Sequence, residues 1–365
     1  MTSRERLLAA LDRKVPDRLP ATTHHLMPSF LASMGHVDER GFFDRFNLDA
    51  VSWATPLETP IDRGGPGWSL EREQVPDTRY VTTRYRFCTR RGTLTTVLQD
   101  DGRTTWVRER LIKDKGDIAA VEEIVIDPRC DAGAVGAAVE SIGDRGILRG
   151  AVPGFPVYGQ PGCWQDAAVL AGIEPLILAT FSDPGWVTAL LSLVQRPKLA
   201  FLSSARGARF DLLELGGGDA SSTVISPSIF DRFVAPFDGP LIAAAHDGGL
   251  RVVYHTCGGM MPFLERIADM SPDAMETFTP KSMGGDTRIG EAKRRIGGRV
   301  AMIGGFDQFH HFVGGDADAT RREVRRLFEE AGGGGGFILA PSDHFFEAED
   351  ALLHAFADEA QACRY

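Results

Sequence analysis

The stretch LRVVYHTCGG (residues 250–259) places a short apolar, β-branched run before a histidine, a cysteine and two glycines. Such a run, bounded by glycines, is typical of a buried β-strand that ends in a loop. Similar stretches recur between residues 146 and 343, with helical patterns between them: GILRGAVPG, RFDLLELGGG, PDAMETFTP, RVAMIGGFD and GGFILAPSD. Repeated strand–loop–helix units predict a parallel sheet.

Two earlier stretches, DRLPATT (17–23) and LDAVSWA (48–54), bring the strand candidates to the eight that a closed barrel needs. A doubly wound open sheet is the alternative, but no GxGxxG motif follows a first strand and opens a helix. The run GGGGGF (332–337) precedes a strand instead, which is typical of a helix-to-strand connection. The sequence therefore predicts an α/β fold, a (β/α)₈ TIM barrel.

Two further features surround this barrel. Leu7, Leu8 and Leu11 recur at helical spacing before Pro16 and predict an N-terminal helical extension. Residues 67–113 are rich in Thr, Tyr, Val and Arg in partial alternation, which predicts an inserted β-meander. We expect one barrel domain over residues 1–365 that carries this insertion.

Composition limits the class of protein. The net charge of −10 argues against binding to nucleic acid or to an anionic membrane surface. The first residues are charged throughout and contain no apolar segment of a signal peptide. Five scattered cysteines do not form the framework of a disulfide-rich secreted protein. These features predict a cytoplasmic protein without disulfides.

In a TIM barrel, catalytic residues come from the carboxyl ends of the strands. At the ends of the predicted strands stand residues that nearly all suit metal binding or acid–base chemistry. They are Asp49, Glu214, Asp219, His255, Cys257, Glu276, Asp307, Asp343 and His344. Packing does not require polar groups at a barrel mouth, so we expect a catalytic site there.

His255 and Cys257 are the strongest metal-ligand candidates. Their spacing places both side chains on one face of an extended segment, and imidazole with thiolate suits Zn²⁺. Asp343 or His344, in the loop after the last strand, supplies the expected third ligand. The alternative is a buried cysteine beside a hydrogen-bonded histidine. His24 and His25 follow the first strand candidate and are weaker candidates, because hydrogen-bonded histidines are commoner than ligands.

Six segments, in order, carry a family resemblance: DRLP, ISPSIFDRFVAPFDGPLIAAAHDGG, VYHTCGG, ETFTPKSMGGD, IGGFDQ and GGFILAPSDHFF. The chain resembles the uroporphyrinogen decarboxylase superfamily over almost its whole length, most closely in its C-terminal half. The resemblance implies a (β/α)₈ barrel. The superfamily contains tetrapyrrole decarboxylases and zinc-dependent methyltransferases that pass a methyl group between a corrinoid and a thiol.

The decarboxylase and methyltransferase branches of the superfamily differ in residues at known motifs. The decarboxylases carry an arginine-rich N-terminal stretch that pairs with substrate carboxylates, whereas TTHHLMPSFLASMG (22–35) contains no arginine. The methyltransferase branch carries H-x-C and a later cysteine as zinc ligands. His255 and Cys257 match the first two, but Ser342, Asp343 and His344 stand where the later cysteine would be.

The resemblance favours a zinc-dependent methyltransferase whose metal activates a small-molecule thiol. The methyl donor would be a methylcorrinoid carried by a separate corrinoid protein, and the enzyme would form a homodimer. Glu214 or Glu276 would be a further ligand or would orient His255. Asp49 would line the mouth as an acid–base group.

Three alternatives stay open. The first is a decarboxylase of a pyrrolic or aromatic acid, in which Asp49 stabilises the protonated ring and no metal is required. The second is a zinc-dependent lyase or hydrolase that activates water or an alcohol. The third is a barrel that binds a ligand without turnover.

Overall fold

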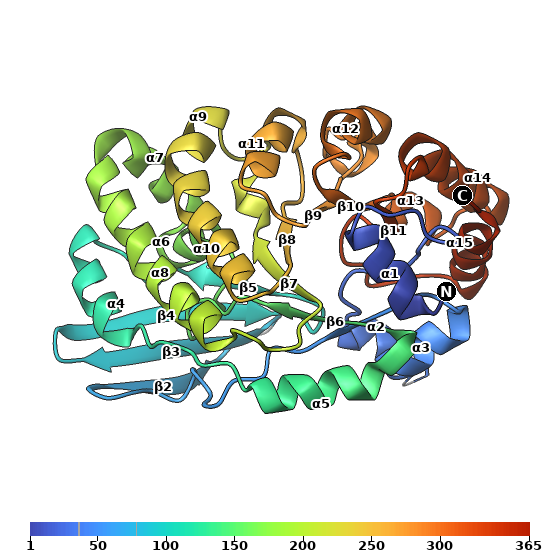
Figure 1. Cartoon of the computed structure of the whole chain (residues 1–365). Coiled ribbons are helices and arrows are strands. Elements are labelled where there is room, and N and C mark those ends of the chain that lie inside the picture. The colour runs from blue at the N-terminus through green and yellow to red at the C-terminus, as the bar shows by residue number, and fades with distance from the viewer. Residues whose placement is uncertain (36, 78) are drawn as a thin grey trace.

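The computed structural model describes residues 1–35, 37–77 and 79–365, and it contains two β-sheets surrounded by helices (Figure 1). The first is a parallel sheet in the order β1-β6-β7-β8-β9-β10-β11, and the second is antiparallel in the order β2-β3-β4-β5. The strands of the parallel sheet are β1 (Ala50–Trp53), β6 (Gly146–Ala151), β7 (Leu212–Gly216), β8 (Val252–His255), β9 (Ala274–Thr277), β10 (Ala301–Phe306) and β11 (Phe337–Pro341). The strands of the second sheet are β2 (Trp68–Val75), β3 (Val81–Thr89), β4 (Gly92–Asp100) and β5 (Thr105–Glu109).

Helices follow the strands of the parallel sheet and cover it, as the alternating pattern predicts; α8, α10, α11 and α12 flank it in Figure 1. The α-helices are α1 (Ser3–Leu11), α2 (Pro28–Ser33), α3 (Glu39–Phe46), α4 (Ile118–Ile124), α5 (Ala132–Ile142), α6 (Cys163–Ala171), α7 (Ile173–Ser182), α8 (Pro184–Ser204), α9 (Pro227–Ile229), α10 (Ala235–Asp247), α11 (Leu264–Asp269), α12 (Ile289–Ile296), α13 (Gln308–His311), α14 (Ala317–Leu327) and α15 (Asp350–Ala362). No helix in the described part of the chain is long and apolar enough to cross a membrane.

The parallel sheet is closed by a segment too short to count as a strand. Ala21 forms a parallel bridge with Leu339 of β11, whose amide donates to the carbonyl of Pro20 at 2.9 Å. The amide of Thr22 donates back to the carbonyl of Leu339 at 2.9 Å. The amide of Asp49, just before β1, donates to the carbonyl of Ala21 at 2.8 Å. The predicted DRLPATT segment thus takes the eighth position, and the TIM-barrel fold is confirmed.

Alternate residues of the strands face the inside of this barrel, where they form an apolar layer. The layer is a hydrophobic cluster separate from the one outside the sheet, and the strands contribute Val51, Ile147, Leu212, Val253, Ala274, Ala301, Ile303, Ile338 and Ala340. Leu7, Ala10 and Leu11 of α1 belong to the same cluster, so the predicted N-terminal helix closes the amino end of the barrel. That end is therefore filled, and the carboxyl ends of the strands are left for a site.

The predicted β-meander is confirmed as the antiparallel sheet β2–β5, which forms a separate layer in Figure 1. Its β4–β5 hairpin reaches the rim of the barrel at two points. Arg103 pairs with Glu347 at 2.8 Å, and the hydroxyl of Tyr158 donates to the carbonyl of Thr105. The insertion is therefore held against the loops that follow β6 and β11.

Asp49 does not line the mouth, and that expectation is wrong. It precedes β1, so it lies at the amino end of the strand, and its side chain is fully buried. Arg6 donates to its carboxylate at 2.7 Å, both terminal nitrogens of Arg18 donate at 3.1 Å, and the amide of Ala21 donates at 3.0 Å. This carboxylate ties α1 and the closing segment to β1, which is a structural role.

Replacement of this carboxylate should destabilise the fold. Asp49→Ala leaves the guanidiniums of Arg6 and Arg18 buried without their shared partner, at an expected cost of about 3 kcal/mol in the free energy of unfolding. Urea denaturation followed by circular dichroism measures this loss. The control is Asp44→Ala, which removes an exposed carboxylate of α3 and should leave the midpoint of urea denaturation unchanged. A loss equal to that of the control would contradict the structural role of Asp49.

Candidate active site

A polar layer lies directly above the apolar layer inside the barrel. Its members stand two residues beyond inward-facing apolar residues, because successive inward positions of a strand are two apart. They are Trp53, Arg149, Glu214, His255 and Glu276, which follow Val51, Ile147, Leu212, Val253 and Ala274 on the same strands. On these five strands the carboxyl-terminal half therefore carries polar or aromatic side chains, and the amino-terminal half carries apolar ones.

Arg149 of β6 is the centre of this layer. Its guanidinium donates to Glu276 of β9 at 2.7 Å and to Glu214 of β7 at 2.6 Å, and it lies 4.2 Å from the centre of the Trp53 ring. Arg149 and Glu276 are buried, so neither charge could be left unpaired without a large penalty. Burial alone would raise the pKa of Glu276, but the charge of Arg149 outweighs it and holds that pKa well below its usual value.

Glu276 in turn fixes the ring of His255 at the end of β8. The Nδ1 atom of His255 lies 2.8 Å from Oε1 of Glu276, which leaves Nε2 for a ligand. Burial alone would lower the pKa of His255, but the neighbouring Cys257 and Glu276 hold that pKa well above the usual value of an imidazole. A metal ion bound to Nε2 of His255 would displace the proton on that atom.

Cys257 follows His255 in the loop after β8, and its half-buried side chain lines the barrel mouth together with the imidazole. The thiol lies against Gly218, in the loop after β7. A Cβ atom at Gly218 would lie only 2.6 Å from the Sγ atom of Cys257, well inside van der Waals contact. The absence of a side chain at this glycine therefore provides the space that the sulfur occupies.

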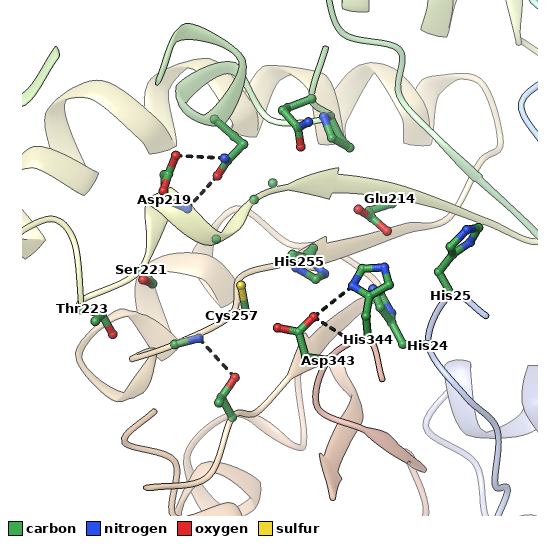
Figure 2. Close-up of a pocket in the computed structure, with 18 of the residues that line it drawn as sticks. His24, His25, Glu214, Asp219, Ser221, Thr223, His255, Cys257, Asp343 and His344 are labelled. Atoms are coloured by element: carbon green, nitrogen blue, oxygen red, sulfur yellow. Dashed lines mark hydrogen bonds and ion pairs between the residues drawn. The ribbon is translucent and has the colours of Figure 1, made fainter. Parts of the chain in front are cut away.

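Asp343 and His344 approach the same opening from the loop after β11 (Figure 2). Oδ1 of Asp343 lies 3.0 Å from Nδ1 of His344. Burial alone would raise the pKa of Asp343, but the hydrogen bond from His344 and the charge of His255 lower it to about 2. A carboxylate and an imidazole are thus both present beside His255 and Cys257.

These residues line one pocket of about 710 Å³ at the barrel mouth. Figure 2 shows the thiol of Cys257 and the imidazole of His255 facing the same space as Asp343 and His344. Glu214 and Asp219 also line the pocket, and none of its lining residues in the described chain is a lysine or an arginine. The pocket is therefore suited to a cation or a metal ion rather than to a substrate with several carboxylates.

His24 lies close to the candidate metal ligands, although the sequence made it only a weak candidate. Among the residues that the structure describes, His24, Glu214, His255 and Glu276 bring ligand atoms within 4.8 Å of one another, which makes a second candidate metal group. Burial dominates at His24 and holds its pKa well below the usual value, so the ring is neutral. However, Arg149 already donates to both carboxylates of this group, and its positive charge disfavours a cation there.

Seven residues were predicted to act as metal ligands or in catalysis, and the structure brings six of them into one region: Glu214, Glu276, His255, Cys257, His344 and Asp343. Asp49 is the exception. Sequence reasoning missed Arg149 and gave too little weight to His24. The signal for Arg149 was present, because an arginine in the middle of the apolar run GILRGA is expected to be buried with acidic partners.

Comparison with known proteins identifies the family. Residues 100–346, more than half of the chain, match the model of the family described as "Uroporphyrinogen decarboxylase (URO-D)". The chain belongs to the uroporphyrinogen decarboxylase family. Its curated relatives are distant. The uroporphyrinogen decarboxylase of Azotobacter vinelandii is 27% identical over 238 residues, which are 63% of each chain. That of Alcanivorax borkumensis is 25% identical over 373 residues, 92% of this chain and 90% of the relative.

A solved structure confirms the fold of this family member. The methyltransferase from Methanosarcina mazei superposes with a TM-score of 0.67 over 99% of both chains, at 16% sequence identity. At this identity the likeness concerns the arrangement of strands and helices. The activity of this chain has to be argued from its own pocket.

Gly218→Ala tests the packing around the thiol. The added methyl group would displace the Sγ atom of Cys257, so we expect zinc affinity to fall by about tenfold or more, as when a ligand loses its orientation. Competition with a chromophoric chelator measures the affinity. The control is Gly136→Ala in α5, where no atom lies within 4 Å of the added Cβ. Equal affinities in the two variants would contradict the placement of the thiol.

Proposed function

We propose that this protein is a zinc-dependent methyltransferase that moves a methyl group from a corrinoid donor to a thiol. The observation that carries the proposal is the arrangement of His255 and Cys257. The imidazole uses Nδ1 to bind Glu276, and the thiol of Cys257 lines the same pocket as the imidazole. A carboxylate behind a ligating histidine is the usual support of a protein zinc site.

The proposed zinc ligands are His255, Cys257 and either Asp343 or His344. Three protein ligands leave an open position, as catalytic zinc sites require. Zinc bound there would supply Lewis acidity, which makes a coordinated thiol a thiolate near neutral pH. A His/Asp ligand in place of a second thiolate makes the metal more acidic.

The chain's own residues prepare the rest of the site. Glu276 orients His255, and Arg149 holds Glu276 in its ionised form. Glu214 lines the pocket and uses Oε2 to bind Arg149, so its other oxygen can accept the proton that a thiol releases. The pocket opens toward solvent beside Phe309, which is 55% exposed and can meet the donor on a separate corrinoid protein.

Two observations disfavour a decarboxylase. That mechanism would use Asp49 to stabilise a protonated ring, but this carboxylate is buried at the opposite end of β1. A decarboxylase would also have to hold the carboxylate that it removes inside this pocket, and the described lining residues include no lysine or arginine to pair with it. A zinc-dependent lyase or hydrolase would use the same metal site. It would differ from a methyltransferase in the group that the metal activates, which would be water or an alcohol instead of a thiol.

Metal content separates the two candidate ligand groups. The purified protein should bind about one zinc per chain, since three ligands and an open position form one catalytic site. Cys257→Ser should lose the metal because it removes a thiolate ligand, whereas His24→Gln should retain it. Elemental analysis after dialysis measures both, with Cys88→Ser on β3 as the control for loss of a thiol. Loss of zinc in His24→Gln and retention in Cys257→Ser would contradict the proposed set.

Activity is tested with free methylcobalamin and 2-mercaptoethanol. The zinc-loaded protein should demethylate the cobalamin, with methyl transfer to the thiol, and His255→Ala and Cys257→Ala should lower the rate to that of the buffer. Visible absorption of the cobalamin and mass spectrometry of the thioether follow the reaction. Zinc-loaded protein that leaves both compounds unchanged, or equal rates with and without the metal, would contradict the proposed function.

A further inference from the structure

A second cleft, of about 620 Å³, lies beside the pocket. It runs between β5 of the inserted sheet and helices α6 and α7 of the barrel. Its lining residues are Trp106, Val107, Arg108, Glu109, Arg110, Lys113, Tyr158, Ala168, Val169, Gly172, Ile173 and Asp219. Because β5 is an edge strand, its outer side faces this cleft without another strand in between.

Two arginines in the cleft have no acidic partner among the residues that the structure describes. Arg108 is exposed, and neither it nor Arg110 forms an ion pair with a residue in the described part of the chain. The guanidinium of Arg110 uses Nε to donate to the carbonyl of Ile112 at 3.1 Å, and its side chain lies against Gly172. Most arginines of the inserted sheet are paired, for example Arg84 with Glu73 at 3.2 Å. The two free guanidiniums are therefore available for an anion.

The rest of the cleft is aromatic and apolar. Trp106 and Arg108 of β5 both line the cleft. Val169 and Ile173 provide apolar surface from α6 and α7, and Tyr158 stands at the edge. An organic body could lie on this surface while its acid group binds the arginines.

The cleft adjoins the candidate active site at Asp219, which lines both. Gln165 fixes this residue, because its side-chain amide donates to Oδ2 of Asp219 at 2.9 Å and accepts from the Asp219 amide at 2.6 Å. The cleft and the pocket therefore meet at a side chain that is held in place. The pocket itself has no lysine or arginine among its described lining residues, so an acid group is better accommodated in the cleft.

We propose that this cleft binds the oxyanion of an organic acid, a carboxylate or a phosphate ester with an apolar body, through Arg108 and Arg110. The bound molecule extends past Asp219, so its opposite end lies in the pocket. Its assignment as a substrate rests on the proposed function, because that function makes the pocket the active site. Binding itself does not depend on methyl transfer.

Calorimetry with simple probes tests the site. Benzoate and phenyl phosphate carry the oxyanion on an aromatic body, and benzamide has the same body without charge. At low ionic strength, metal-free protein should bind at least one of the two anions and should bind benzamide at least tenfold more weakly. The tighter anion indicates which acid the cleft prefers. Equal binding of benzamide and both anions, or no binding of either anion, would overturn the proposal.

Variants locate the bound anion. The double variant R108A/R110A should weaken the tighter anion at least tenfold. The double variant R84A/R86A removes the same charge from β3 of the same sheet and should change affinity less than twofold. Equal losses in the two double variants would indicate general electrostatic attraction and overturn the proposal. Metal-free protein is used throughout, so a failure here is distinguishable from a failure of methyl transfer.

Chemical protection provides a measurement that needs no variant. Phenylglyoxal modifies free guanidiniums, and mass spectrometry of peptides reports which arginines have reacted. We expect Arg108 and Arg110 to react in the free protein and to be protected at saturating concentrations of the tighter anion, while Arg91 reacts equally in both. Unchanged modification of Arg108 and Arg110 at saturation would overturn the proposal.

Discussion

The buried guanidinium of Arg149 lies between the carboxylates of Glu214 and Glu276, and the geometry of the candidate site follows from this contact. Two carboxylates and an imidazole could not share the inside of a barrel unless a fixed positive charge compensated them. With Arg149 in place, Glu276 stays ionised and holds Nδ1 of His255. The other ring nitrogen is thereby left for the pocket, where Cys257 lies.

The barrel makes this arrangement possible by separating its two ends. At the amino end, α1 inserts Leu7 into a ring of apolar side chains, and the buried Asp49 ties the helix to the strands. One inward position further along β1, β6, β7, β8 and β9, the same barrel presents charged and aromatic groups. Packing at one end can thus hold the ionic layer rigid, so binding of a metal would require little rearrangement of His255.

Much of this could be predicted from the sequence. Strand–loop–helix repeats predicted the barrel, and the ends of the strands predicted Glu214, His255 and Glu276 at its mouth. Asp49 was misplaced, although it is the second residue of the predicted strand LDAVSWA (48–54) and the direction of the chain already puts it at the amino end of β1. Arg149 was missed because its partners lie 65 and 127 residues away, and only the closed barrel brings them together. The eighth barrel position was predicted, although a single bridge forms it.

X-ray absorption at the zinc edge of the metal-loaded protein tests the central claim most directly, because it identifies the atoms bound to the metal. The account predicts one sulfur at about 2.3 Å, from Cys257, together with nitrogen and oxygen at about 2.0–2.2 Å. The sulfur contribution should vanish in Cys257→Ser. A shell of nitrogen and oxygen alone in the unaltered protein would contradict the account and would place the metal among His24, Glu214, His255 and Glu276 instead.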